Sequence, residues 1–190
     1  MKNYSLMPAR KFLSNREGIA ATEFALLLPV MITVFFGMLE LSDLMTMNRR
    51  VAVAVNTMAD LTAQTGELTH NDVDDLMDGI TEIIEPHDTS AIGINLVSVI
   101  KVDGDPVVHW SYDESGTEPY TAGSAFNVLS DNTLITDSGS VIVIEFTYPF
   151  VPRFAGHFVT APFTFNRRAI RWPRLTTRVQ LCDNSNNCTT

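Results

Sequence analysis

The sequence lacks the residue patterns on which enzyme active sites and metal centres are usually built. No Gly-x-Ser-x-Gly elbow, Walker phosphate loop, Gly-x-Gly-x-x-Gly turn or His-Glu-x-x-His motif occurs. The four histidines show no metal-ligand spacing: His70, His87, His109 and His157. The sequence therefore predicts no catalytic residue, no metal site and no cofactor, and a protein that is not an enzyme.

Positive charge is scarce after the first 18 residues. The whole chain has a formal charge of −9, and residues 19–190 carry nine Lys plus Arg against 21 Asp plus Glu, a charge of −12. Such acidity argues against nucleic acid as a partner. Residues 67–118 contain thirteen acids and one cation, whereas residues 153–178 contain six arginines and no acid. We expect these two segments to face each other within the fold or to meet head to tail between subunits.

One long apolar stretch dominates the N-terminal part of the chain. From Ile19 to Leu39, a span of 21 residues, only Glu23 is ionisable. A helix needs about 20 such residues to cross a bilayer, so residues 19–40 are predicted to be a transmembrane helix. A carboxylate inside such a segment is costly, which makes Glu23 a functional candidate.

The charges before this stretch set the expected topology. Four basic residues and one acidic residue precede it: Lys2, Arg10, Lys11, Arg16 and Glu17. By the positive-inside rule, residues 1–18 are a cytoplasmic leader and the C-terminal part lies on the far side of the membrane. The apolar stretch is long for a cleaved secretory signal, and Ser42-Asp43 is a poor cleavage site, so we expect the helix to be retained.

The only two cysteines lie near the C-terminus, at Cys182 and Cys188. An even number of cysteines outside the cytoplasm fits a disulfide. Because the enclosed loop is short, its stabilisation should lie at the low end of the usual range of about 2–4 kcal/mol. Two cysteines alone supply too few ligands for a metal site.

The transmembrane helix is expected to continue over residues 41–66 and to stop near Gly66. Pro29 and Gly37 lie within its membrane portion, and Pro29 should kink or loosen it. Beyond the membrane, apolar residues recur at helical spacings of three and four: Leu44, Met47, Val51, Ala54, Met58 and Leu61. This stripe is interpreted as packing on the chain's own domain, and a further hypothesis adds packing against neighbouring subunits.

Residues 67–190 are predicted to form an extracytoplasmic α+β domain. Thr69 and Asp72 resemble a capping box for a second amphipathic helix ended by Pro86, whose acidic outer face is expected to be solvated rather than to bind calcium. Alternating residues predict a hairpin over 92–112 with a turn at 103–106. Further strands are expected over 141–148, ended by Pro149 and Pro152, and within 163–181. The fold class is thus a long N-terminal helix packed on a small, mostly antiparallel sheet.

The residues around Gly18 resemble a type IV pilin signal: a basic leader ending in Gly, an apolar helix, and Glu23 and Phe24 at the fifth and sixth positions after the Gly. Pro29, Gly37 and Glu40 then make the segment similar to the TadE-like pseudopilins of tight-adherence (Tad/Flp) pilus systems. So do the segments Met58-Ala59-Asp60-Leu61-Thr62-Ala63-Gln64 and Val141-Ile142-Val143-Ile144-Glu145-Phe146-Thr147-Tyr148-Pro149-Phe150.

This resemblance implies a pilin-like fold and a minor pilin that takes part in assembly of an adhesive pilus. It implies a single-pass precursor in the bacterial inner membrane, cut by a prepilin peptidase between Gly18 and Ile19, with a periplasmic domain and association with the pilus after processing. The partners implied are the peptidase and other pilin-like subunits of the same pilus.

Cleavage there would create a charged amine at Ile19, beside Glu23 and Phe24. Both charges are costly in the membrane, so the amine of one subunit meeting Glu23 of its neighbour would offset that cost and set an axial register. Alternatively, Glu23 extends to the membrane surface. A different hypothesis for the whole chain is a permanently anchored extracytoplasmic binding or scaffold protein, which would not be cleaved.

Overall fold

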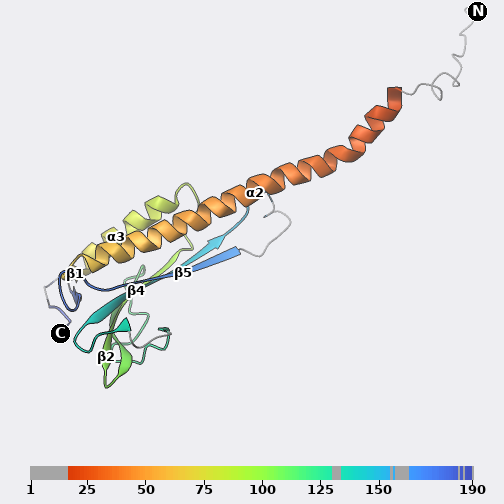
Figure 1. Ribbon diagram of the computed structural model, residues 1–190. Helices are drawn as coiled ribbons and strands as arrows, with labels where there is room; N and C mark the ends of the chain where they lie inside the picture. The colour runs from red at the N-terminus through yellow and green to blue at the C-terminus, as the bar shows by residue number, and fades with distance from the viewer. Residues whose placement is uncertain are drawn as a thin grey trace, which may run out of the picture. The chain divides into compact units, whose positions relative to one another are not determined.

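A computed structural model describes residues 17–129, 134–154, 156, 163–183, 185 and 187–189. These residues form two compact units, one ending at Ser42 and one beginning at Asp43. The helices and strands, labelled in Figure 1, are α2 (Glu17–Ala63), β1 (Glu67–Thr69), α3 (His70–Ile84), β2 (Gly93–Val102), β3 (Asp105–Asp113), β4 (Ser140–Phe150), β5 (Phe163–Arg171) and β6 (Gln180–Cys182). The predicted α+β class, a long N-terminal helix with a small antiparallel sheet, is confirmed.

The second unit is built on a four-stranded sheet of order β3-β2-β4-β5, in which every neighbouring pair is antiparallel. Figure 1 shows α3 beside the C-terminal half of α2, on the same side of this sheet. The predicted apolar stripe explains this packing, because Met47, Val51, Ala54 and Met58 are completely buried in the core. They pack in one cluster with residues of α3 and of one sheet face.

The opposite face of the sheet has a core of its own. Val97, Val99 and Val143 point to that side and pack against Phe126 and Ile135 from the long segment between β3 and β4. Because β4 is buried on both faces, its sequence reads as a continuous apolar run rather than as a strict alternation.

The predicted hairpin is confirmed, with a shorter turn than expected. Only Asp103 and Gly104 form the loop, and both have positive φ angles, 53° and 94°. This pattern is typical of the type I′ turn that joins two antiparallel strands. Asp105 and Pro106, predicted as part of the turn, belong to β3 instead. Pro106 is tolerated there because β3 is an edge strand of the sheet.

The prediction that Pro149 ends its strand was wrong. Pro149 lies inside β4 and pairs with Thr164 of β5, and the strand ends one residue later at Phe150. The pairing with β2 reaches only as far as Thr147. Beyond that residue β4 has a neighbour on one side only, so a residue without a backbone N–H fits there.

Two short elements close the domain at the C-terminal end of α2. β1 and β6 pair in parallel, with Leu68 opposite Leu181, a contact that the sequence did not predict. The predicted capping box is confirmed: the Asp72 carboxylate accepts from the Thr69 N–H at 2.8 Å, and the Asp72 N–H donates to the Thr69 hydroxyl at 3.2 Å. The structure also contains a disulfide that joins Cys182, the last residue of β6, to Cys188.

Candidate functional site

The first unit presents the predicted transmembrane segment as an uncovered apolar helix. α2 is long and apolar enough to cross a membrane, and in its most apolar stretch no residue is buried by the described part of the chain. Ile19 is 53% exposed and Phe24 is 57% exposed. A single apolar N-terminal helix of this kind fits a membrane-anchored protein, since in water this surface would have no cover.

The threonine hydroxyls of this segment form hydrogen bonds within the helix itself, and the Glu23 carboxylate is a different kind of polar group. The Thr22 hydroxyl donates to the Ile19 carbonyl and the Thr33 hydroxyl donates to the Pro29 carbonyl, each at 2.8 Å. Such bonds within one helix leave no hydroxyl donor facing lipid. Glu23 is therefore the chemically distinctive group of the segment, an exposed carboxylate one turn after Ile19.

Gly18 and Ile19 lie in the first helical turn of α2, and a side chain added at Gly18 would meet nothing within 4 Å. The helix continues through Pro29 and Gly37 without interruption. The predicted kink at these residues stays a prediction, as does the pairing role of Ile19, Glu23 and Phe24.

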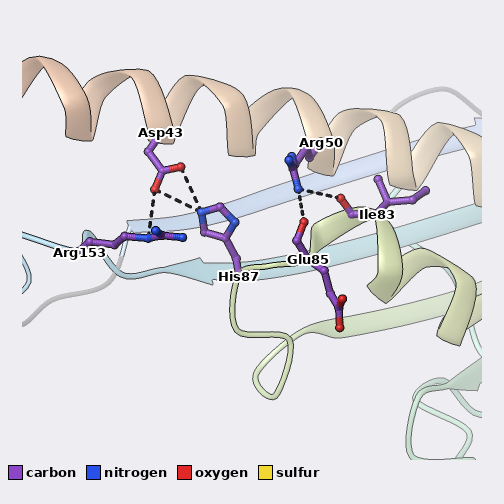
Figure 2. A network of polar contacts seen from close by, with 6 residues as sticks. All are labelled: Asp43, Arg50, Ile83, Glu85, His87 and Arg153. Atoms are coloured by element: carbon purple, nitrogen blue, oxygen red, sulfur yellow. Dashed lines mark hydrogen bonds and ion pairs between the residues drawn. The ribbon is translucent and has the colours of Figure 1, made fainter.

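In the second unit, the start of the domain is held by a polar cluster that the sequence did not reveal (Figure 2). The Asp43 carboxylate of α2 accepts from His87 Nε2, at 3.2 Å to each oxygen, and forms an ion pair with Arg153 Nε at 3.9 Å. His87 follows α3, and Arg153 follows β4. One carboxylate thus joins α2 to two connecting segments that are far apart in the sequence.

Arg50, in the same view, binds the end of α3 (Figure 2). Its guanidinium donates to the Ile83 carbonyl at 3.5 Å and also to the Glu85 carbonyl. The last carbonyls of a helix have no partner within that helix, and they carry partial negative charge. Because the last turn of α3 contains no basic residue, Arg50 supplies this positive charge from α2.

We expect Arg50→Met to lower the free energy of unfolding of the domain by about 1.5–3 kcal/mol, the range for a hydrogen bond to a charged group. Denaturant unfolding in detergent micelles measures this difference. Arg49→Met is the matched control, since Arg49 is exposed on the next position of the same helix and should change stability by under about 0.5 kcal/mol. Equal losses in both variants would contradict the role of Arg50.

A row of arginines also fastens the C-terminal part of the chain to α2. The contacts are Arg167 to Asn48, Arg171 Nη2 to Asn56 at 2.7 Å, and Arg174 to Asp60. The spacings match: eight helical residues from Asn48 to Asn56 rise about 12 Å, and four strand residues from Arg167 to Arg171 span about 13 Å. α2 and β5 therefore run in the same direction.

These contacts correct the expectation that the acidic and arginine-rich segments face each other within the fold, whereas their meeting between subunits stays a prediction. Among the described residues, no ion pair joins the acidic segment 67–118 to the arginines of 153–178. The arginines pair instead with Asp43 and Asp60 of α2 and with Glu145 of β4, where Arg168 lies 2.9 Å from the carboxylate. The acidic residues of α3 remain at the surface, and among the described residues no group of three potential ligands is placed to hold a metal ion.

A cavity of about 390 Å³ lies between α3 and the neighbouring ends of β2 and β3. Asp74, Asp78 and Glu114 line it, and Glu114 is engaged, since its carboxylate accepts from the Ile94 N–H at 2.9 Å. Burial raises the pKa of Tyr112, also in its wall, and a hydrogen bond to Asp74 adds to this effect. The cavity thus offers acidic and hydroxyl groups.

The similarity to a known protein family lies in α2. Residues 18–60 match the family model of the TadE-like proteins. The match confirms the resemblance predicted from Gly18, Glu23 and Pro29, and it covers nearly the whole of α2. No curated protein and no solved structure matches the chain.

The TadE-like segment contains both parts of the candidate site. It includes the apolar stretch with Glu23, and it includes the α2 residues that hold the domain: Asp43, Asn48, Arg50, Asn56 and Asp60. The last four of these residues are not members of the predicted apolar stripe. The domain after residue 60 lies outside the match.

Proposed function

We propose that the chain is a TadE-like minor pilin or pseudopilin that takes part in the assembly of a Tad-type adhesive pilus. The observation that carries this proposal is the family match, which begins at Gly18, the residue after which the pilin signal would be cut. The uncovered apolar helix that follows supports it, because a pilin-like subunit needs such a helix both in the membrane and among other subunits.

In this proposal the chain is made as a single-pass precursor of the bacterial inner membrane. Residues 1–18 lie in the cytoplasm and the domain lies in the periplasm, as the basic leader favours. A prepilin peptidase cuts after Gly18, leaving the apolar helix as the new N-terminus with a charged amine at Ile19. Other pilin-like subunits then meet this helix.

The amine and Glu23 give the helix its means of recognising a neighbour. Within one chain Glu23 is exposed, so its carboxylate is available to the amine of another subunit. In a low-dielectric surrounding, pairing two opposite charges removes most of the cost of burying either alone. The pairing fixes one stagger between adjacent helices, whereas apolar contacts alone would allow sliding.

Deletion of the coding sequence from its own bacterium tests the proposed function. We expect loss of surface pili and of surface adhesion, measured by electron microscopy and by the amount of pilin in sheared fractions, with recovery when the wild-type chain is supplied. Normal piliation in the deletion strain would contradict a role in assembly.

A further inference from the structure

Described residues that follow β4, together with the first residue of β5, carry apolar side chains on the outside of the domain. Val151 is 61% exposed, Phe154 48% and Phe163 54%. Phe163 begins β5 opposite Phe150, the last residue of β4, so these side chains gather where the two strands end. Arg153, with 60% of its side chain exposed, lies among them. We call Val151, Arg153, Phe154 and Phe163 the β4–β5 tip.

Contacts within the domain place this tip at the end of the domain that follows the apolar segment. Arg153 Nε lies 3.9 Å from Asp43, and the ring of Phe150 lies 6.1 Å from that of His87, which is itself bonded to Asp43. Asp43 comes four residues after Leu39 in the chain. At 1.5 Å per residue of helix, this is about 6 Å from the end of the apolar segment.

The opposite end of the domain is far away along α2. There the Arg174 N–H donates to the Ala63 carbonyl at 2.8 Å. Twenty residues of α2 separate Asp43 from Ala63, a rise of about 30 Å. Leu175, next to Arg174, is also apolar and is 75% exposed. Exposed apolar residues thus occur at both ends, and the tip lies at the end where α2 enters the domain, since Arg153 contacts Asp43.

The composition of the tip suits the surface of a bilayer. The headgroup layer on each side of the hydrocarbon core is about 5–8 Å thick, so Asp43 and its contacts lie at headgroup level. Aromatic rings are favoured at that level, and an arginine there can pair with anionic lipid headgroups. Isolated exposed apolar residues need no explanation, but three together beside a membrane span do.

We propose that the β4–β5 tip docks into the headgroup layer of the same bilayer that holds α2. The domain then has two attachments to the membrane, the helix and the tip, which restrict its rotation about the helix axis. This inference rests on the proposed membrane anchoring of α2.

Photocrosslinking of the full chain tests this. The protein is reconstituted in vesicles of phosphatidylethanolamine and phosphatidylglycerol, with p-benzoyl-phenylalanine placed in separate variants at Leu26, Phe154, Phe163 and Leu175. All four side chains are exposed, so the analogue does not disturb the core. Mass spectrometry after irradiation measures the fraction of chain that carries a lipid adduct.

We expect lipid adducts at Leu26, Phe154 and Phe163, and at least tenfold fewer at Leu175. Adducts at Leu26 without adducts at Phe154 and Phe163 would overturn the docking of the tip and leave the anchor intact. Absence of adducts at Leu26 would overturn the anchoring and the docking together. Crosslinks from Phe154 to a second copy of the chain in place of lipid would show a subunit interface and would also overturn the proposal.

Discussion

Replacing Glu23 with alanine is expected to reduce recovery of the chain with other pilin-like subunits about 100-fold. In the proposed pairing, the Ile19 amine of the neighbouring subunit binds the Glu23 carboxylate. The variant removes this carboxylate and leaves the amine unpaired in a low-dielectric surrounding. Removing one member of a buried ion pair costs about 3–5 kcal/mol, and about 3 kcal/mol already corresponds to a factor of about 100 in an equilibrium constant. Glu23 is exposed in the single chain, so the domain itself should fold normally.

Co-purification from solubilised membranes, quantified against the input, measures this loss. Glu23→Asp is the matched control, because it keeps the carboxylate and should retain a substantial part of the association. Both variants should still lose the leader, since the peptidase acts at Gly18. Wild-type recovery of Glu23→Ala would contradict the pairing and would favour a carboxylate that simply extends to the membrane surface.

Replacing Gly18 with valine is expected to block removal of the leader, so that cells accumulate the uncleaved precursor in place of a chain that lacks residues 1–18. A side chain at this position meets nothing within 4 Å in the chain itself. The substitution therefore leaves the protein's own packing unchanged. Its expected effect is that the larger side chain keeps the bond after residue 18 from binding in the active site of the peptidase. Immunoblotting of membranes resolves the two lengths.

Gly37→Ala provides the matched control for this experiment. Gly37 also lies in α2, and a side chain there likewise meets nothing within 4 Å. This variant should be processed like the wild-type chain. Complete processing of Gly18→Val would show that the cut lies elsewhere or does not depend on the glycine.

Local patterns were enough to predict most of the elements. The stripe from Met47 to Met58 correctly predicted which face of α2 packs on the domain. A helix that buries one side must repeat apolar residues every three or four positions. Asp103 and Gly104 gave the hairpin, because few other residues tolerate a left-handed backbone. The motif beginning at Gly18 gave the family resemblance that the match over residues 18–60 confirms.

Contacts between distant segments were not predictable in the same way. The partners of Asp43 are His87 and Arg153, 44 and 110 residues further along the chain, and no local pattern links them. Within the chain, the charge runs suggested the wrong partners for the arginines, since α2 supplies isolated polar residues such as Asn48 and Asp60 rather than a run. Pro149 was misjudged because a proline is excluded only where the strand has neighbours on both sides.

The position of the mature N-terminus tests the proposed processing most directly. The chain is purified from membranes of its own bacterium with the prepilin peptidase present, and its intact mass and N-terminal peptide are measured by mass spectrometry. We predict a chain that begins at Ile19 and, in cells lacking the peptidase, a chain that retains residues 1–18. A chain that keeps its leader when the peptidase is active would contradict the proposal and would favour a permanently anchored protein.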